Sequence, residues 1–247
     1  MDLVFLLVVA GGFASGFVIG LAGFGVGLIA LGFWLHVMEP IVAGPLVVIC
    51  SVVGQIRSIA PVRRDISFRR ILPLVVGGII GLPLGVYLLN HVSGQDLKVG
   101  LGFFLIAYSI VGLAIKFGPV FANAGVLSDG AVGFGGGIFG GIAGLSGPLA
   151  TVWCGLRGWT KDQQRATYQS YNLIILSFAV VAYASQGLLT REVGVLTLMI
   201  IPAFLVGVQL GLMAYKRVDE NGFRRLILVL LLASGTSLVV NNALSTG

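Results

Sequence analysis

Residues 125–155 decide the fold and read GVLSDGAVGFGGGIFGGIAGLSGPLATVWCG, a run with a single charged residue, Asp129. As one α-helix, 31 residues would extend about 46 Å, whereas the hydrocarbon core of a bilayer is about 30 Å thick. The run is too long for one upright span and too short for two. Its 11 glycines weaken a straight helix and permit tight turns. We therefore expect a broken, re-entrant hairpin; a single tilted helix packed through small residues is the alternative.

A second run of the same kind occurs at 3–33, with 8 glycines. Gly20-Leu-Ala-Gly23-Phe-Gly25 aligns with Gly141-Ile-Ala-Gly144-Leu-Ser146 at an offset of 121, and Gly81-Leu-Pro-Leu-Gly85 aligns with Gly207-Val-Gln-Leu-Gly211 at an offset of 126. The pattern predicts two repeats, 1–120 and 121–247, that form one transport domain. The predicted segments are a hairpin at 3–33 with spans 40–60, 71–90 and 97–116, and a hairpin at 125–155 with spans 166–186, 193–215 and 223–242.

The composition agrees with a membrane protein. The chain is 57% hydrophobic and 10% charged, whereas soluble domains carry about 25% charged residues. We expect an all-α, polytopic helical protein whose surroundings are a lipid bilayer. Its start, Met1-Asp2-Leu3, lacks the basic flank of a signal peptide, so the first apolar run should be retained. Trp34 and Trp159 are assigned to the interfacial belt.

Charge placement predicts the orientation of the repeats. If each long run returns to the side it entered, 13 basic residues gather on one side and only Lys98 and Arg191 lie on the other; if each run crosses once, the split is 7 to 8. Cytoplasmic loops are enriched in Lys and Arg, which favours the first arrangement, with inverted repeats and both termini outside. The same placement accounts for the net charge of +6 without a nucleic-acid partner.

The chemistry of the hairpins predicts an anion site. Ser146-Gly147-Pro148 has the residues of a helix start, and the matching positions in the first repeat are Gly25, Val26 and Gly27. Two half-helix N-termini, each with roughly half a positive charge, would then point at one central cavity. Glycines that only permit close helix packing are the alternative.

Polar residues follow each hairpin and could line this cavity. Ser51 and Asn172 are equivalent at the 121 offset, and Arg57 and Arg165 near predicted span ends could attract an anion, although they also serve as topology markers. The candidate substrate-binding residues are Gly25, Val26, Gly27, Ser51, Gln55, Arg57, Ser146, Gly147, Pro148, Arg165, Gln169 and Asn172.

Other functions find less support. All nine acidic residues fall at predicted loops or span ends, whereas a cation carrier or proton relay usually needs an acid within the membrane. Gly144-Leu-Ser146-Gly147 has the Gly-x-Ser-Gly form of rhomboid proteases, but the two histidines, His36 and His91, both precede it. Cys50 and Cys154 form no metal or disulfide pattern. We expect no enzyme activity, no cofactor and no metal.

The sequence resembles the sulfite exporter TauE/SafE family of bacterial inner-membrane permeases. The resemblance rests on Gly20-Leu-Ala-Gly-Phe-Gly-Val-Gly27, Gly144-Leu-Ser-Gly-Pro148, Gly158-Trp-Thr-Lys161, Arg165-Ala166-Thr167 and Asn172. The first half departs from the family pattern because no proline follows its glycine cluster in Leu28-Ile-Ala-Leu-Gly32.

Membership implies transport, commonly export, of a small anionic substrate such as sulfite, sulfoacetate or another organosulfonate. It also implies a multi-pass protein of the bacterial inner membrane. A channel for anions or neutral solutes and a non-transporting membrane scaffold are the alternatives, and the sequence leaves a homo-oligomer open.

Overall fold

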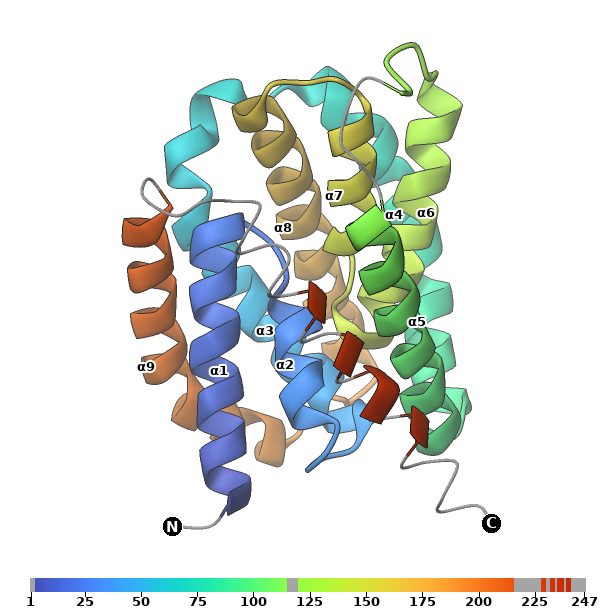
Figure 1. Cartoon of the computed structure of the whole chain (residues 1–247). Coiled ribbons are helices and arrows are strands. Elements are labelled where there is room, and N and C mark those ends of the chain that lie inside the picture. The colour runs from blue at the N-terminus through green and yellow to red at the C-terminus, as the bar shows by residue number, and fades with distance from the viewer. Residues whose placement is uncertain are drawn as a thin grey trace.

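The computed structural model describes residues 3–114, 120–215 and, near the C-terminus, 228, 229, 232, 233, 235–237, 239 and 240. Within these residues every regular element is a helix (Figure 1). The predicted span 223–242 lies largely outside the described residues. The all-α expectation is confirmed for the rest of the chain.

Both long glycine-rich runs are interrupted. In the first, α1 (Leu3–Ala22) ends before Gly23, and α2 (Val26–Trp34) begins after Gly25. In the second, α6 (Val126–Ala143) is followed by α7 (Gly147–Leu156). The alternative of one tilted helix is therefore wrong for each run.

The two limbs of each hairpin differ in length. The first limbs contain 20 and 18 residues and the second limbs 9 and 10. At 1.5 Å per residue the first limbs extend about 27–30 Å and the second limbs only about 15 Å. Figure 1 shows that α1 and α2 enter and return at the lower end of the molecule, and that α6 and α7 enter and return at the upper end.

The other described helices are of ordinary span length or close to it. They are α3 (Pro40–Ser58), α4 (Phe68–His91), α5 (Gly94–Ala114), α8 (Lys161–Ser185) and α9 (Arg191–Ala214), with a short 3-10 helix η1 (Ala60–Asp65) after α3. The start of α8 precedes the predicted 166 because Thr160 and Gln163 form a reciprocal capping box. A capping box depends on polar residues, which a search for apolar runs passes over.

Glycines bring the hairpins against helices of the other half. In α1 and α9, Gly16 faces the backbone of Phe204 and Gly207 faces the carbonyl of Phe13 so closely that a Cβ would overlap. The pair α4 and α6 repeats these contacts, with Gly137 against Gly78 and Gly81 against Phe134. Gly137 corresponds to Gly16 at the offset of 121, and Gly207 corresponds to Gly81 at the offset of 126. The two helix pairs therefore make equivalent contacts. Small residues allow this approach, which is the usual way helices associate in lipid.

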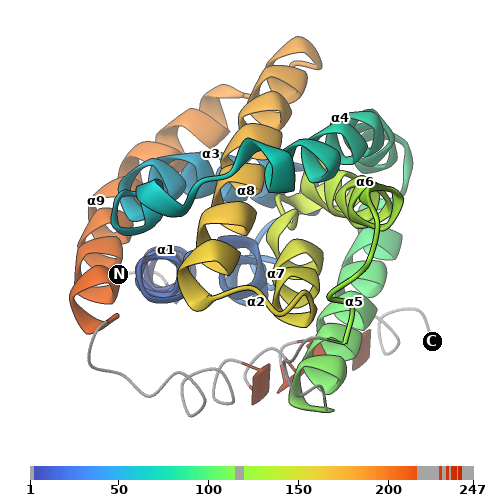
Figure 2. The same cartoon turned by 90° about the horizontal axis from the view of Figure 1, so that it is seen from above.

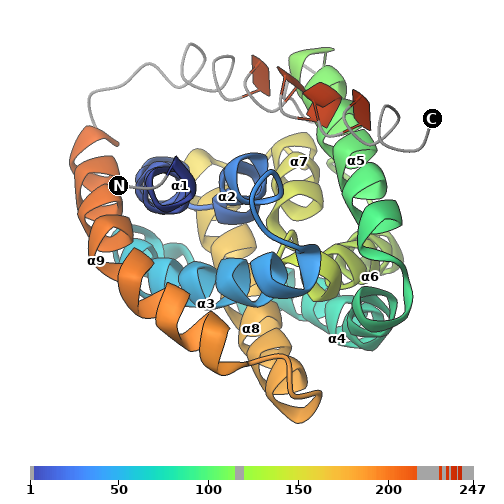
Figure 3. The ribbon, with the colours of Figure 1, turned by 90° about the horizontal axis from the view of Figure 1, so that it is seen from below.

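Views from the two ends place the elements around a central group (Figures 2 and 3). α1, α2 and α7 lie in a row, α3 and α8 cross beside them, and the pairs α1·α9 and α4·α6 occupy opposite sides. In the described part of the chain, six helices are long and apolar enough to cross a membrane, namely α1, α3, α4, α5, α6 and α9. The chain is a polytopic helical membrane protein.

One expectation about an aromatic residue is wrong. Trp34 is fully buried, and its indole Nε1 donates a hydrogen bond to the carbonyl oxygen of Val8 at 3.0 Å. It therefore packs inside the first hairpin and does not belong to an interfacial belt. A tryptophan near the end of a span can lie either in the protein interior or at the membrane interface, so its position in the sequence did not distinguish the two.

Candidate functional site

The two interruptions meet in the middle of the molecule. We call Gly23–Phe24–Gly25 tip 1 and Gly144–Leu145–Ser146 tip 2. A Cβ added at Gly27 would lie 2.8 Å from Cδ2 of Leu145, and one added at Gly147 would lie 3.4 Å from Cβ of Phe24. The tips are thus in contact through the first residues of the helices that follow them.

Glycine is required where the chain turns. Gly23 and Gly25 have φ values of 78° and 95°, and Gly144 has a φ of 68°. These values lie in the left-handed region, which other residues rarely adopt. The repeated Gly-x-x-Gly pattern therefore marks the turns themselves, in addition to any role in helix packing.

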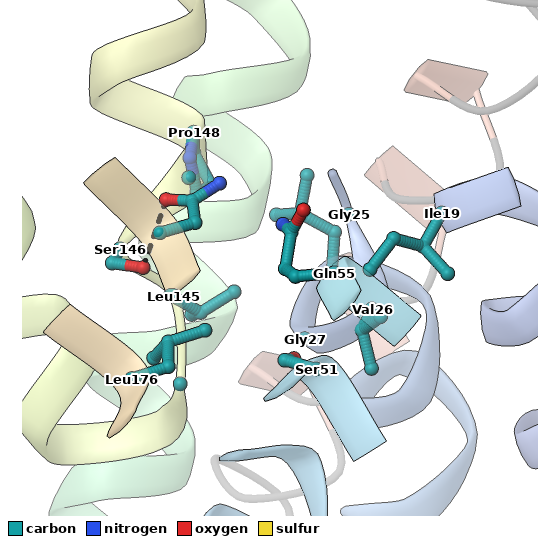
Figure 4. A pocket seen from close by; sticks show the side chains of 14 residues that line it. Ile19, Gly25, Val26, Gly27, Ser51, Gln55, Leu145, Ser146, Pro148 and Leu176 are labelled. Atoms are coloured by element: carbon teal, nitrogen blue, oxygen red, sulfur yellow. Dashed lines mark hydrogen bonds between the residues drawn. The ribbon is translucent and has the colours of Figure 1, made fainter. Parts of the chain in front are cut away.

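A small cavity lies between the tips, with Ser146 on one side and Gln55 on the other (Figure 4). Its free space is about 10 Å³, close to the room that a single water molecule needs. Its lining consists of Ile19, Gly25, Val26, Gly27, Leu28, Ser51, Gln55, Gly144, Leu145, Ser146, Gly147, Pro148, Asn172 and Leu176. The polar lining side chains are two hydroxyls and two amides, and none of the lining residues is charged.

Two helix N-termini contribute to this lining. The residue preceding α2 is Gly25, the residue preceding α7 is Ser146, and neither makes a side-chain cap bond. The first N–H groups of a helix have no intrahelical acceptor and carry a partial positive charge. Pro148 lacks an N–H, so its neighbours supply the donors of α7. The cavity can therefore offer backbone donors from two opposed hairpins to one ligand.

Side-chain hydrogen bonds position the polar lining. Ser146 Oγ donates to Asn172 Oδ1 at 3.0 Å, and Gln55 Nε2 donates to the carbonyl oxygen of Gly23 at 3.2 Å. Gln55 is 1% exposed, and its Oε1 has no hydrogen-bond partner among the described residues. The Gln55 amide on α3 is thus held against tip 1, and the Asn172 amide on α8 is held against tip 2.

Arg165 and Gln169 lie behind tip 1 and do not line the cavity. Arg165 Nη1 donates to Leu21 O at 3.0 Å and Nη2 donates to Gly20 O at 3.1 Å, so the buried guanidinium caps the carbonyl end of α1. Gln169 Nε2 donates to Ser58 Oγ at 2.9 Å. A cation at the C-terminus of a helix stabilises it, and this gives Arg165 a structural role that the sequence did not suggest.

Arg57 is also outside the cavity. Its side chain is exposed and donates to Gln209 Oε1 at 3.2 Å. The other nine predicted site residues line the cavity together: Gly25, Val26, Gly27, Ser51, Gln55, Ser146, Gly147, Pro148 and Asn172. The sequence prediction omitted Gly144 and Leu145, although they belong to the motif that contains Ser146, and it omitted Ile19, Leu28 and Leu176, which carry no signal beyond being apolar.

Ser146 is not placed as an activated nucleophile. Its hydroxyl donates to an amide oxygen, whereas a nucleophilic serine needs a neighbouring base. Within the described ranges, no group of three or more His, Cys, Asp or Glu side chains is arranged to hold a metal ion. The polar groups of the lining can form hydrogen bonds to a ligand.

Comparison with known protein families gives one match. Residues 8–238 match the model described as "Sulfite exporter TauE/SafE", so the match covers nearly the whole chain and both hairpins. No curated protein and no solved structure matches.

Proposed function

The chain belongs to the sulfite exporter TauE/SafE family of membrane transporters, and from this premise we propose that it carries small sulfur-containing anions, such as sulfite, sulfoacetate or other organosulfonates, out of the cell. We further propose that it resides in the bacterial inner membrane and works by alternating access. The observation that supports this best is that the N-termini of α2 and α7 line the same cavity. Helix N-termini bind oxyanions without a dedicated cationic side chain.

The arrangement of the hairpins supports an inverted-repeat mechanism. Figure 1 shows them entering from opposite ends of the molecule, and the helix contacts recur at the repeat offsets. Inverted repeats commonly place the substrate site between the repeats near the bilayer midplane, where broken helices supply the ligands. A motion of one repeat against the other would open the cavity to each side in turn.

The basic residues support the orientation. One end of the molecule carries η1, the start of α4 and the loop between α7 and α8 (Figure 1), and cytoplasmic ends are rich in Lys and Arg. The described basic residues of these segments and of the first two turns of α8 are Arg63, Arg64, Arg69, Arg70, Arg157, Lys161 and Arg165. We propose that this end faces the cytoplasm, while Lys98 and Arg191 mark the opposite face.

Counterflow in proteoliposomes tests the transport proposal. Liposomes that contain the purified chain are loaded with unlabelled sulfite, and entry of labelled sulfite is followed with and without the internal load. A carrier gives saturable uptake that the internal load stimulates. Conductance without saturation supports a channel, and the absence of any flux supports a scaffold.

Gly27→Leu provides the matched variant for this assay. The new side chain would enter the contact with Leu145 and the carbonyl of Gly144, where even a Cβ lies within 3.2 Å of that oxygen. We expect at least tenfold slower counterflow because the tips would be wedged apart. Gly194→Leu in α9 is the control, since nothing lies within 4 Å of a Cβ at that position.

Thiol labelling of intact cells tests the orientation. Cys50 and Cys154 are buried and are first replaced by alanine. Single cysteines are then placed at Thr160 and Ser93, two exposed loop positions at opposite ends. An impermeant reagent should label the Ser93 position and spare the Thr160 position; the reverse pattern contradicts the proposed orientation.

A further inference from the structure

The charge that the cavity can balance is limited. None of the fourteen residues that line it is charged, and two helix N-termini together supply about one positive charge. Arg165, the buried cation near tip 1, lies outside the lining, and its Nη1 and Nη2 donate to the carbonyls of Leu21 and Gly20. A monoanion would be compensated in this site, whereas the second charge of a dianion would be buried without a partner.

Gln55 adds an acceptor to the cavity. The orientation of its amide is fixed by chemistry, because the carbonyl of Gly23 can only accept and must therefore face Nε2. The amide oxygen Oε1 is then the free atom, and it is buried without a partner among the described residues. Buried acceptors are normally satisfied, so this oxygen is available to a hydrogen that a ligand brings.

The remaining polar groups are mostly donors. Backbone N–H groups come from the starts of α2 and α7, and a hydroxyl comes from Ser51, whereas the hydroxyl of Ser146 already donates to Asn172 Oδ1. These groups suit the oxygens of an oxyanion. The oxygens of the same oxyanion and Gln55 Oε1 are all acceptors and would repel each other. A ligand that carries a hydrogen of its own would instead donate it to Gln55 Oε1.

We propose that the cavity selects a singly charged oxyanion that carries its own hydrogen-bond donor, which for sulfite is the hydrogensulfite ion, and that Gln55 Oε1 receives that hydrogen. The proposal rests on the proposed anion function and specifies the ligand of the same site. Sulfate and fully ionised sulfite bind more weakly because of their second charge. A sulfonate without a donor binds, but more weakly than hydrogensulfite.

Calorimetric titration of the purified full chain tests this selectivity. The probes are sulfite, methanesulfonate and sulfate, each in oxygen-free buffer below and above neutral pH. Sulfite loses its remaining proton near neutral pH, whereas methanesulfonate stays a monoanion and reports any titration of the protein. We expect the affinity for sulfite to fall in proportion to the hydrogensulfite fraction, the affinity for methanesulfonate to stay constant, and sulfate to bind at least tenfold more weakly.

The results distinguish a failure of the proposed selectivity from a failure of the anion site itself. Sulfite binding that stays constant or strengthens as pH rises, or sulfate binding as tight as that of sulfite, overturns the selectivity and leaves the anion site in place. If none of the three probes binds at any pH, the anion site of the proposed function is wrong and the selectivity falls with it.

A pair of variants assigns the effect to Gln55. Gln55→Met removes the acceptor, so the preference for hydrogensulfite over methanesulfonate should fall about fivefold, the worth of one hydrogen bond. Ser51→Ala removes a donor from the same wall and should weaken both ligands while the preference is kept. Equal preference in Gln55→Met and the unmodified chain contradicts the role of Gln55; if Gln55→Met does not fold, the pH series on the unmodified chain decides the proposal alone.

Discussion

The two hairpins have similar backbones that are stabilised by different chemistry. At tip 1 the carbonyl end of α1 is capped by side chains of α3 and α8, namely Gln55, Arg165 and Tyr168, whose hydroxyl donates to Ala22 O at 2.6 Å. Both tips share one backbone bond, since Gly23 N donates to Ile19 O at 2.8 Å and Gly144 N donates to Gly140 O at 2.9 Å; tip 2 adds a bond from Leu145 N to Phe139 O at 3.1 Å. Near the end of α6 the side-chain donor from α8 is Tyr183, whose hydroxyl donates to Gly141 O at 2.6 Å. Hairpin 1 thus receives more side-chain donors at its tip from α3 and α8 than hairpin 2 does.

The short limbs show the same contrast. In hairpin 1 the indole of Trp34 donates to the carbonyl of Val8; in hairpin 2 Trp153 Nε1 donates to Asp129 Oδ1 at 2.6 Å, and Arg157 lies 3.6 Å from Asp129 Oδ2. Val8 and Asp129 are equivalent at the 121 offset. Trp34 and Trp153 are 119 positions apart, so the two contacts are not fully equivalent; hairpin 1 has a neutral contact to the backbone where hairpin 2 has a charged one.

The largest loss of stability is expected at the glycine contacts that the pairs α1·α9 and α4·α6 share. Gly16→Leu and Gly137→Leu each place a side chain against the backbone of the partner helix, Phe204 in one case and Gly78 in the other. Backbone cannot move aside, so each change should cost about 3 kcal/mol or more. Thermal unfolding in detergent measures this, with Gly194→Leu as the tolerated control. A large loss in only one of the two variants would break the equivalence of the helix pairs.

The next effect separates the capping of the two tips. Arg165→Met removes two charge-assisted hydrogen bonds from buried carbonyls and should cost about 2–3 kcal/mol. Tyr183→Phe removes the single bond to Gly141 O in hairpin 2 and should cost about 1 kcal/mol. Chemical unfolding compares them, and Arg165→Lys should restore only part of the loss because an ammonium group lacks the planar fork. Equal costs would contradict the dependence of hairpin 1 on α8.

A reciprocal exchange at the tips should have unequal results. Gly25→Ser forces a side chain into φ 95° and should cost about 1–3 kcal/mol in strain. Ser146→Gly removes only the bond to Asn172, so stability should fall by about 1 kcal/mol. Both are measured by thermal unfolding. If Gly25→Ser proves the milder change, the left-handed turn at tip 1 is not essential.

The smallest effect concerns the charged contact of hairpin 2. In Asp129→Asn the amide oxygen can still accept from Trp153, and Arg157 keeps its bonds to the carbonyls of Phe121 and Ala124. Arg157 lies 3.6 Å from Asp129 Oδ2, farther than a hydrogen bond, so the loss should stay near 1 kcal/mol. Asp129→Val, which copies the residue of hairpin 1, should be worse in the same unfolding assay because Trp153 also loses its acceptor. Equal losses in the two variants would mean that the charge alone stabilises the contact.

The interruptions were predictable because their chemistry is local. Glycine at the turns and Pro148 in the first turn of α7 fix where a helix ends and where the next begins, so Gly25 and Ser146 could be identified from the sequence. The unequal limbs were not predictable, since an apolar run of 31 residues has the same hydropathy wherever it breaks. The early start of α8 was missed because its first residues are polar.

The environment of each site residue was harder to predict. The bonds of Arg165 to Gly20 and Leu21 join residues about 145 positions apart, and no local pattern distinguishes a capping arginine from one that attracts a substrate. Gln55 and Asn172 could be proposed as cavity residues because they follow the hairpins in equivalent spans. The Oε1 of Gln55, which has no partner in the described part of the chain, owes its position to the turn at Gly23 and becomes visible only in three dimensions.

Anomalous diffraction from crystals grown with selenite tests the central claim most directly, because selenite resembles sulfite and selenium can be located without ambiguity. If two half-helix N-termini form one anion site, a selenium peak should lie between Gly25–Gly27 and Ser146–Pro148, within hydrogen-bond distance of backbone nitrogens from both α2 and α7. A peak beside Arg57 or another surface cation, with none between the tips, would contradict the account.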